Sequence, residues 1–172
     1  MNHPAFLWVT TLPSNVVLAA ATLGPFGHWR KAPGTIGSAL GILLYTVLFY
    51  PLGPLGELLL SLFLVYLAIG ICGEAEKRLW RQDPSEVILD EFVAIPFCFL
   101  GLKQFMYPGN MWMYMLAGFL LFRFFDILKP FGINRLQRLE GGIGIVADDI
   151  AAALATCLCL HLLAAFVFPG YA

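Results

Sequence analysis

The chain has 172 residues, of which 60% are hydrophobic and 12% are charged, and its formal net charge is −1. This length predicts a single domain over residues 1–172, and a mean hydropathy of +0.82 predicts a membrane protein rather than a soluble one. Because the sequence has no basic stripe, we expect no nucleic-acid partner.

The first part of the chain does not read as a membrane crossing. Residues 1–21 have an apolar centre but no Lys or Arg before it, so we expect no cleaved signal peptide. Residues 16–23 are apolar but too few to cross a bilayer, which takes about 20 residues. Two prolines and three glycines over residues 24–35 then exclude a continuous helix. We expect a re-entrant or interfacial helix here.

The rest of the chain alternates apolar runs with short polar segments. We expect crossings over residues 36–50, 58–73, 87–102, 111–125 and 150–168, with turns or loops between them. Gly37, Ser38 and Gly41 form part of a small-residue face suited to close helix contact. Ser85 is expected to cap the helix after the turn at residues 83–86, and Pro96 to kink that helix. The predicted fold is all-α: a polytopic integral membrane helical bundle with re-entrant or broken helices.

Several polar residues carry no predicted site. The four cysteines, at positions 72, 98, 157 and 159, all lie in apolar stretches and have no zinc-site spacing, so we interpret them as buried small hydrophobic residues. His161 is expected to pack in the core. Glu57, in an expected outer loop, is interpreted as a solvated surface charge.

Asp90 and Glu91 are adjacent carboxylates inside an apolar run. A charged side chain at bilayer depth costs about 2.5–3.5 kcal/mol on insertion scales, so the pair calls for a partner or a function. The alternative is that the helix begins close to the interface and both side chains are solvated.

A second group of ionisable residues lies between residues 123 and 149. Arg123, Asp126 and Lys129 are three apart and share one face of a helix, which Pro130 should end or kink. Backbone amides at Gly141 and Gly142 are free to approach an anion before the last helix.

Adjacent carboxylates at Asp148 and Asp149 open the final apolar run and suit Mg²⁺, which binds one or two carboxylates together with phosphate oxygens. The alternative interpretation of this whole region is ordinary: acidic residues that favour a helix N-terminus, and basic residues that only set topology.

The basic residues also predict an orientation. All of them except Lys103 fall on one side of the predicted path, and the positive-inside rule makes that side cytoplasmic. Thr35 and both acidic groups then meet at the cytoplasmic ends of different helices.

Three segments, taken together and in this order, resemble the phosphatidylglycerophosphatase A family: PGTIGS from Pro33, DPSEVILDE from Asp83, and FRFFDILKP followed by GGIGIVADD. The resemblance implies a bacterial inner-membrane, Mg²⁺-dependent lipid phosphatase that converts phosphatidylglycerophosphate, an anionic phospholipid, to phosphatidylglycerol and phosphate. The chain departs from the family pattern at Phe131-Gly132, Gln137 and Glu140, and we assign no catalytic role to Gln137 or Glu140.

From this resemblance, together with the residue patterns above, we predict a catalytic set, a substrate-binding set and a metal-binding set. The predicted catalytic residues are Asp90, Glu91, Asp126, Lys129 and Asp149. The predicted substrate-binding residues are Thr35, Ser38, Arg123, Gly141 and Gly142. The predicted Mg²⁺ ligands are Asp90, Glu91, Asp126, Asp148 and Asp149.

Two other classes of function fit part of the pattern. A small ion transporter or channel also uses intramembrane carboxylates and broken helices, but it predicts acids near the midplane and polar access from outside. A purely structural membrane subunit leaves the Asp90–Glu91 pair without a role.

Overall fold

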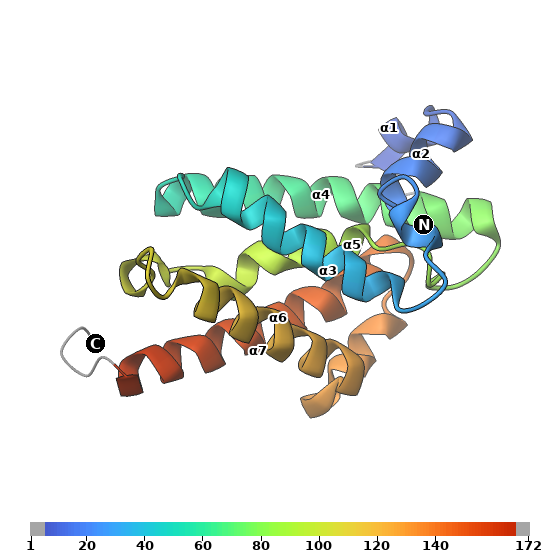
Figure 1. The fold of residues 1–172 in the computed structure, drawn as a ribbon. Coiled ribbons are helices and arrows are strands. Elements are labelled where there is room, and N and C mark those ends of the chain that lie inside the picture. The colour runs from blue at the N-terminus through green and yellow to red at the C-terminus, as the bar shows by residue number, and fades with distance from the viewer. Residues whose placement is uncertain (1–5, 168–172) are drawn as a thin grey trace.

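A computed structural model describes residues 6–167, which form a bundle of helices with no strand in that range. The helices are α1 (Leu7–Thr10), α2 (Ser14–Ala21), α3 (Pro33–Leu44), α4 (Pro54–Leu79), α5 (Leu89–Ala94), α6 (Met111–Leu128) and α7 (Gly142–Val167). Of these, α4, α6 and α7 are long and apolar enough to cross a membrane. Figure 1 shows them side by side, with α1 and α2 packed against one end of α4. The predicted all-α membrane bundle is confirmed.

The segment predicted as the first crossing is shorter than a full span. Helix α3 has 12 residues and continues into five residues of π-helix, Tyr45–Phe49. At 1.5 Å per residue this segment reaches about 25 Å, against about 30 Å of hydrocarbon core. Its small-residue face is confirmed as a contact surface, because a Cβ added at Gly41 would lie 2.7 Å from Ile95 Cγ1 after α5. Helix α3 therefore packs directly onto the centre of the bundle.

Helix α5 is the innermost element, in contact with α3, α4 and α7. It has only six residues and passes into a 3-10 turn, Ile95–Phe99, at the position of Pro96. The change of helix type at Pro96 agrees with the predicted kink, but a continuous crossing over residues 87–102 was wrong. Ser85 as the N-cap was also wrong: Ile88 occupies that position and makes no side-chain cap.

Pro130 follows the end of α6 as predicted, and the chain continues as a 3-10 segment, Pro130–Arg138. Lys129 turns the chain between the two with a left-handed backbone, φ 43°. Helix α7 begins at Gly142, eight residues before the predicted crossing. Asp148 and Asp149 therefore lie about two turns inside the helix rather than at its start; the predicted end at residue 168 lies outside the described range.

Glu57 is not a solvated surface charge, contrary to the sequence interpretation. It lies in the first turn of α4 with 1% of its area exposed, and its carboxylate is 3.1 Å from Lys103 Nζ. Lys103 also donates to the carbonyls of Phe49 and Leu52, each at 2.7 Å. This cluster joins the α3–α4 turn to the chain before α6, because the ammonium group of Lys103 binds three acceptors in and beside that turn.

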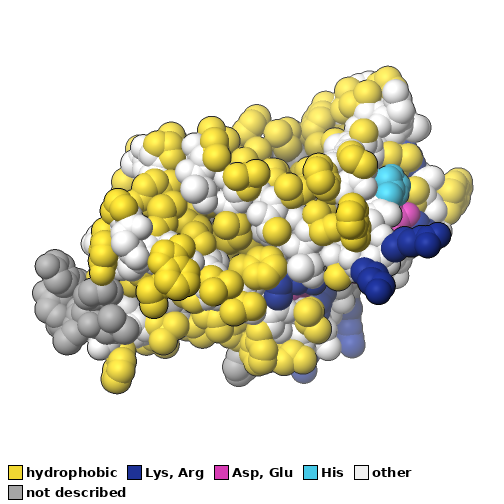
Figure 2. All heavy atoms as spheres, viewed as in Figure 1, with side chains coloured by type: hydrophobic (Ala, Val, Ile, Leu, Met, Phe, Trp, Pro, Cys, Tyr) yellow, Lys and Arg dark blue, Asp and Glu magenta, His cyan; other side chains and the backbone are white. Residues whose placement is uncertain are grey.

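The outer surface is largely apolar. Figure 2 shows hydrophobic side chains over most of one face, with Lys and Arg gathered at the end that carries α1 and α2. Exposed apolar residues include Val47 on the segment after α3, Phe63 on α4 and Leu120 on α6. This distribution suits lipid contact along the bundle and water or lipid headgroups at the charged end.

Candidate active site

One cavity of about 290 Å³ lies where the start of α3, the start of α5, the end of α6 and the second turn of α7 meet. Six carboxylates and two basic side chains line it. The acidic residues are Asp83, Asp90, Glu91, Asp126, Asp148 and Asp149, and the basic residues are Arg123 and Lys129. Acidic groups this numerous repel an anionic ligand unless further positive charge enters the site.

Three of the carboxylates are arranged as a metal-binding group. Oxygen atoms of Asp90, Glu91 and Asp149 all lie within 4.8 Å of one another. Asp90 and Asp149 are 5% and 3% exposed. Hard divalent cations such as Mg²⁺ bind this type of ligand, so the donor chemistry fits.

Buried polar atoms without hydrogen-bond partners also indicate a cation site at the Asp90–Glu91–Asp149 group. Asp90 Oδ1 and Glu91 Oε2 are buried and have no hydrogen-bond partner among residues 6–167. Burial, together with the neighbouring Glu91 carboxylate, raises the pKa of Asp90 well above its usual range. Burial raises the pKa of Glu91 to about 7. A bound cation would neutralise these carboxylates in place of protons and would satisfy the free oxygens.

Arg123 lies beside the acidic group in the same cavity. Its Nη1 lies 2.7 Å from Asp126 Oδ2 and 3.7 Å from Glu91 Oε1, and it donates to Ser38 Oγ at 3.3 Å. Ser38 in turn donates to the carbonyl of Gly34 at 2.8 Å. These contacts fix the guanidinium between α3, α5 and α6.

Lys129, at the end of α6, contacts Asp148 of α7 through a charged hydrogen bond. Burial by itself lowers the pKa of Lys129, but the carboxylates of Asp148, Asp149 and Asp126 outweigh burial and raise it. The ammonium group therefore stays charged. Asp148 Oδ1 has no partner among the described residues, so this carboxylate has one oxygen free for another ligand.

Gly34 is required by the closeness of α3 to the acidic group. A Cβ at this position would lie 2.0 Å from Glu91 Oε1 and 3.2 Å from Arg123 Nη1. A glycine here lets the first turn of α3 form one wall of the cavity.

The structure brings together most, but not all, of the predicted site residues. Asp90, Glu91, Arg123, Asp126, Lys129, Asp148 and Asp149 all line the cavity. Ser38 lies behind it and supports Arg123. Thr35 is half-buried in the first turn of α3 and does not line the cavity.

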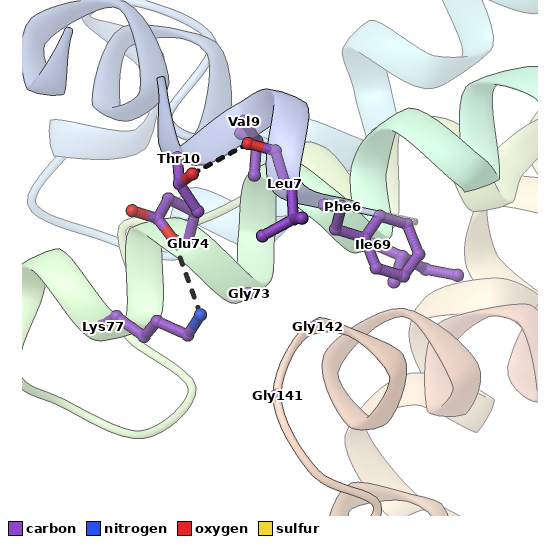
Figure 3. Close-up of a pocket in the computed structure, with 11 residues that line it drawn as sticks. Phe6, Leu7, Val9, Thr10, Ile69, Gly73, Glu74, Lys77, Gly141 and Gly142 are labelled. Carbon is purple, nitrogen blue, oxygen red and sulfur yellow. Dashed lines mark hydrogen bonds and ion pairs between the residues drawn. The ribbon is translucent and has the colours of Figure 1, made fainter. Parts of the chain in front are cut away.

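Gly141 and Gly142 also lie outside this cavity, beside a separate crevice between α1, α4 and the start of α7 (Figure 3). That crevice holds only about 30 Å³, too little for a phosphate group. A Cβ at Gly142 would lie 1.9 Å from the carbonyl oxygen of Ile69, so this glycine allows α7 to cross α4 closely. We therefore leave Gly142 out of the anion-binding group, contrary to the sequence interpretation. Gly141 does not line the reaction cavity either, but it lines two neighbouring hollows of about 490 Å³ and 1,020 Å³.

Sequence reasoning missed Asp83 and Ser85 as parts of the cavity wall. Asp83 has a left-handed backbone, φ 45°, and its Oδ2 accepts a hydrogen bond from Gln137 at 3.0 Å. The available signal is the carboxylate of the Asp-Pro turn, which lies only seven residues before Asp90.

The known proteins that this chain resembles all carry the names of lipid phosphatases. The sequence model of the family described as Phosphatidylglycerophosphatase A matches residues 19–164. A Bacteroides thetaiotaomicron protein named "Putative phosphatidylinositol-3-phosphatase" is 33% identical over 158 residues, covering 90% of this chain and 91% of that protein.

Two relatives named Phosphatidylglycerophosphatase A complete the comparison. The Haemophilus influenzae protein is 38% identical over 129 residues (74% of this chain, 76% of that protein). The Escherichia coli protein is 29% identical over 132 residues (76% and 73%). No solved structure matches the chain.

Proposed function

The chain belongs to the phosphatidylglycerophosphatase A family and is a phosphoric monoester hydrolase, and from this premise we propose its substrate, its metal and its orientation. The proposed reaction is hydrolysis of the terminal phosphate of phosphatidylglycerophosphate at the cytoplasmic face of a bacterial inner membrane, with Mg²⁺ as cofactor. The observation that carries the proposal is one cavity that combines the Asp90–Glu91–Asp149 group with Arg123 and Lys129.

The choice of substrate rests on the relatives. The family description and two relatives name phosphatidylglycerophosphate, whereas the Bacteroides relative names a phosphoinositide. Both lipids carry a phosphate monoester on a polyol headgroup, and the membrane helices of the chain suit a lipid of this kind. We propose phosphatidylglycerophosphate because the family model covers residues 19–164.

Asp90, Glu91 and Asp149 would hold the cation, since their oxygens converge and two of them lack protein partners. When bound there, Mg²⁺ supplies positive charge for the phosphate oxygens and lowers the pKa of a bound water. Asp126 and Asp148 are engaged by Arg123 and Lys129, so we place them around the cation rather than among its direct ligands.

The two basic side chains supply the rest of the phosphate site. Arg123 and Lys129 approach the cavity from the end of α6 and neutralise the oxygens that gain charge as the P–O bond to the headgroup breaks. A new P–O bond forms to the oxygen of water, one proton leaves that water, and one proton is taken up by the headgroup alcohol. Asp148 Oδ1, which has no partner among residues 6–167, can accept the first of these protons.

The orientation is supported by the distribution of basic residues. Arg30, Lys31, Lys77 and Arg81 lie in or beside the same ends of α3, α4 and α5 as the cavity, whereas Lys103 lies at the other end of the bundle. Under the positive-inside rule the cavity end is cytoplasmic. The transporter alternative predicted acids near the midplane, and the cavity instead lies where the ends of several helices meet.

Phosphate release by the purified protein tests the proposal. We expect release from phosphatidylglycerophosphate in mixed micelles with Mg²⁺, and little release without it. Release from phosphatidylinositol 3-phosphate measured in parallel distinguishes the two named lipid classes. No release from phosphatidylglycerophosphate under any metal condition would contradict the proposed substrate.

A further inference from the structure

A second cavity of about 490 Å³ continues from the reaction cavity. The two share Asp83 and Ile145 as common lining residues. The polar wall of the second cavity is formed by Glu76, Gln82, Asn134, Gln137 and Arg138, from the end of α4, the following turn and the 3-10 segment. Its volume falls within the range of small-molecule sites, about 300–1,000 Å³.

We propose that this second cavity is a headgroup subsite, which binds the polyol and the phosphodiester of the lipid while the monoester lies in the reaction cavity. The proposal rests on the proposed function, because it takes the substrate to be a phosphorylated glycerophospholipid. It assigns binding roles to residues that do not line the reaction cavity, and it makes them determinants of headgroup specificity.

The wall of the subsite is held in place by internal contacts. Gln137 Nε2 donates to Asp83 Oδ2 at 3.0 Å, and the Asp83 backbone N–H donates to Glu76 Oε1 at 3.3 Å. These bonds connect the 3-10 segment, the turn before α5 and the end of α4. A wall formed before the ligand arrives reduces the ordering that binding requires.

The lining chemistry matches a polyol. The side-chain amides of Gln82 and Asn134 can each donate and accept hydrogen bonds, as hydroxyl groups require. The surrounding carboxylates, Glu76 and Asp83, add acceptors for hydroxyl protons. An apolar wall would leave buried hydroxyl groups without partners.

Arg138 is placed for the phosphodiester. It lines both the second cavity and a wider open groove of about 1,020 Å³ beyond it. Arg138 is exposed, and among residues 6–167 no carboxylate forms an ion pair with it. A guanidinium group suits a phosphodiester because it presents several N–H donors in one plane.

The groove beyond Arg138 gives the acyl chains a route to the bilayer. Trp80 and Leu139 line it, with 93% and 47% of their area exposed. Exposed Trp is typical of the membrane–water interface. The three hollows therefore follow the order of the lipid itself: monoester, polyol, phosphodiester, then acyl chains.

The test compares Arg138→Ala with Arg135→Ala, two exposed arginines of the same 3-10 segment of which only Arg138 lines these hollows. For phosphatidylglycerophosphate in mixed micelles we expect Arg138→Ala to raise KM about tenfold with kcat within about twofold of wild type, because a bond to a charged group is lost. Arg138→Lys should recover part of the loss. Asn134→Ala, which changes no charge, should raise KM about threefold, and Arg135→Ala should leave KM unchanged.

A second measurement is independent of turnover. Glycerophosphoglycerol, the headgroup without acyl chains or monoester, should bind wild type in calorimetry and bind Arg138→Ala at least fivefold more weakly. Equal KM effects in Arg135→Ala and Arg138→Ala, or none in either, would overturn the subsite. If the wild-type protein releases no phosphate, the proposed function fails, and the calorimetry alone tests the subsite. Loss of glycerophosphoglycerol binding in Arg138→Ala but not in Arg135→Ala then supports the subsite. No binding of glycerophosphoglycerol to the wild-type protein overturns it.

Discussion

The ammonium group of Lys129, at the end of α6, contacts the carboxylate of Asp148, about two turns into α7. The contact closes one side of the reaction cavity and leaves Asp148 Oδ1 free. It also ties together two helices that the sequence separates by the whole 3-10 segment.

Lys129→Arg should therefore lower turnover at least about tenfold, and Lys129→Ala should lower it more. Arginine keeps the charge, but its planar fork needs different room beside Asp148, and Pro130 restricts the backbone that follows. Phosphate release and a cysteine-accessibility test of topology check this, with the exposed Lys31→Arg as control. Wild-type rates in both Lys129 variants would reduce Lys129 to a topology signal.

Metal removal should abolish phosphate release, and Mg²⁺ should restore it. The buried oxygens of Asp90, Glu91 and Asp149 lie too close together to be charged without a cation. The thermal unfolding midpoint should also rise with Mg²⁺ concentration, because the folded state alone holds the three ligands together. Full activity after exhaustive chelation would exclude the metal site.

Asp90→Asn, Asp126→Asn and Asp149→Asn should each remove most turnover. Asp90→Asn and Asp149→Asn should in addition raise the unfolding temperature of the chelated protein, since each removes a buried carboxyl group that costs free energy either to ionise or to protonate at neutral pH. Asp126→Asn should not raise it, because Asp126 is already paired with Arg123. Unfolding temperatures measured in EDTA, compared with the rates of phosphate release, separate effects on catalysis from effects on folding. A lower unfolding temperature in all three variants would count against a cation site.

Gly34→Ala should lower turnover about 10²-fold while Gly53→Ala leaves it unchanged. A methyl group at Gly34 would meet Glu91 Oε1 at 2.0 Å, whereas a Cβ at Gly53 meets nothing within 4 Å. Displacing a catalytic group by about 1 Å costs this order of rate. Normal activity in Gly34→Ala would mean that the cavity tolerates a wider separation of α3 from α5.

Lys103→Ala should destabilise the fold by about 3–5 kcal/mol, because it leaves the Glu57 carboxylate buried and uncompensated. The double variant Glu57→Gln with Lys103→Met should recover most of that loss. Denaturant titration in detergent measures both variants. A single variant as stable as wild type would show that water reaches Glu57.

Much of the architecture follows from composition and spacing. Long apolar runs predict membrane helices because a buried backbone in lipid must satisfy its own hydrogen bonds. Pro130 ends α6 because proline cannot continue the hydrogen-bond ladder. Asp90 and Glu91 stand out because charge inside an apolar run is costly, and the structure places both in the reaction cavity.

Other features depend on contacts between distant segments. The sequence predicts a surface charge at Glu57, whereas in the structure Glu57 is buried against Lys103, 46 residues further along the chain. The sequence predicts anion binding at Gly142, whereas the structure uses this glycine for close contact with Ile69 of α4. Asp83 lines the cavity with its carboxylate held by Gln137 of the 3-10 segment and its backbone N–H bonded to Glu76 of α4. No local periodicity encodes these distances.

The adjacent residues Asp148 and Asp149 show where local reasoning stops. From the sequence they form one acidic pair that begins a helix. Within α7, neighbouring side chains point about 100° apart, so the two carboxylates face different partners. Asp149 faces Asp90 and Glu91, and Asp148 faces Lys129. The sequence alone identifies both aspartates as candidate site residues. Which of them joins the cation-binding group and which contacts Lys129 depends on the rotation of α7 against α5 and α6, and packing decides that rotation.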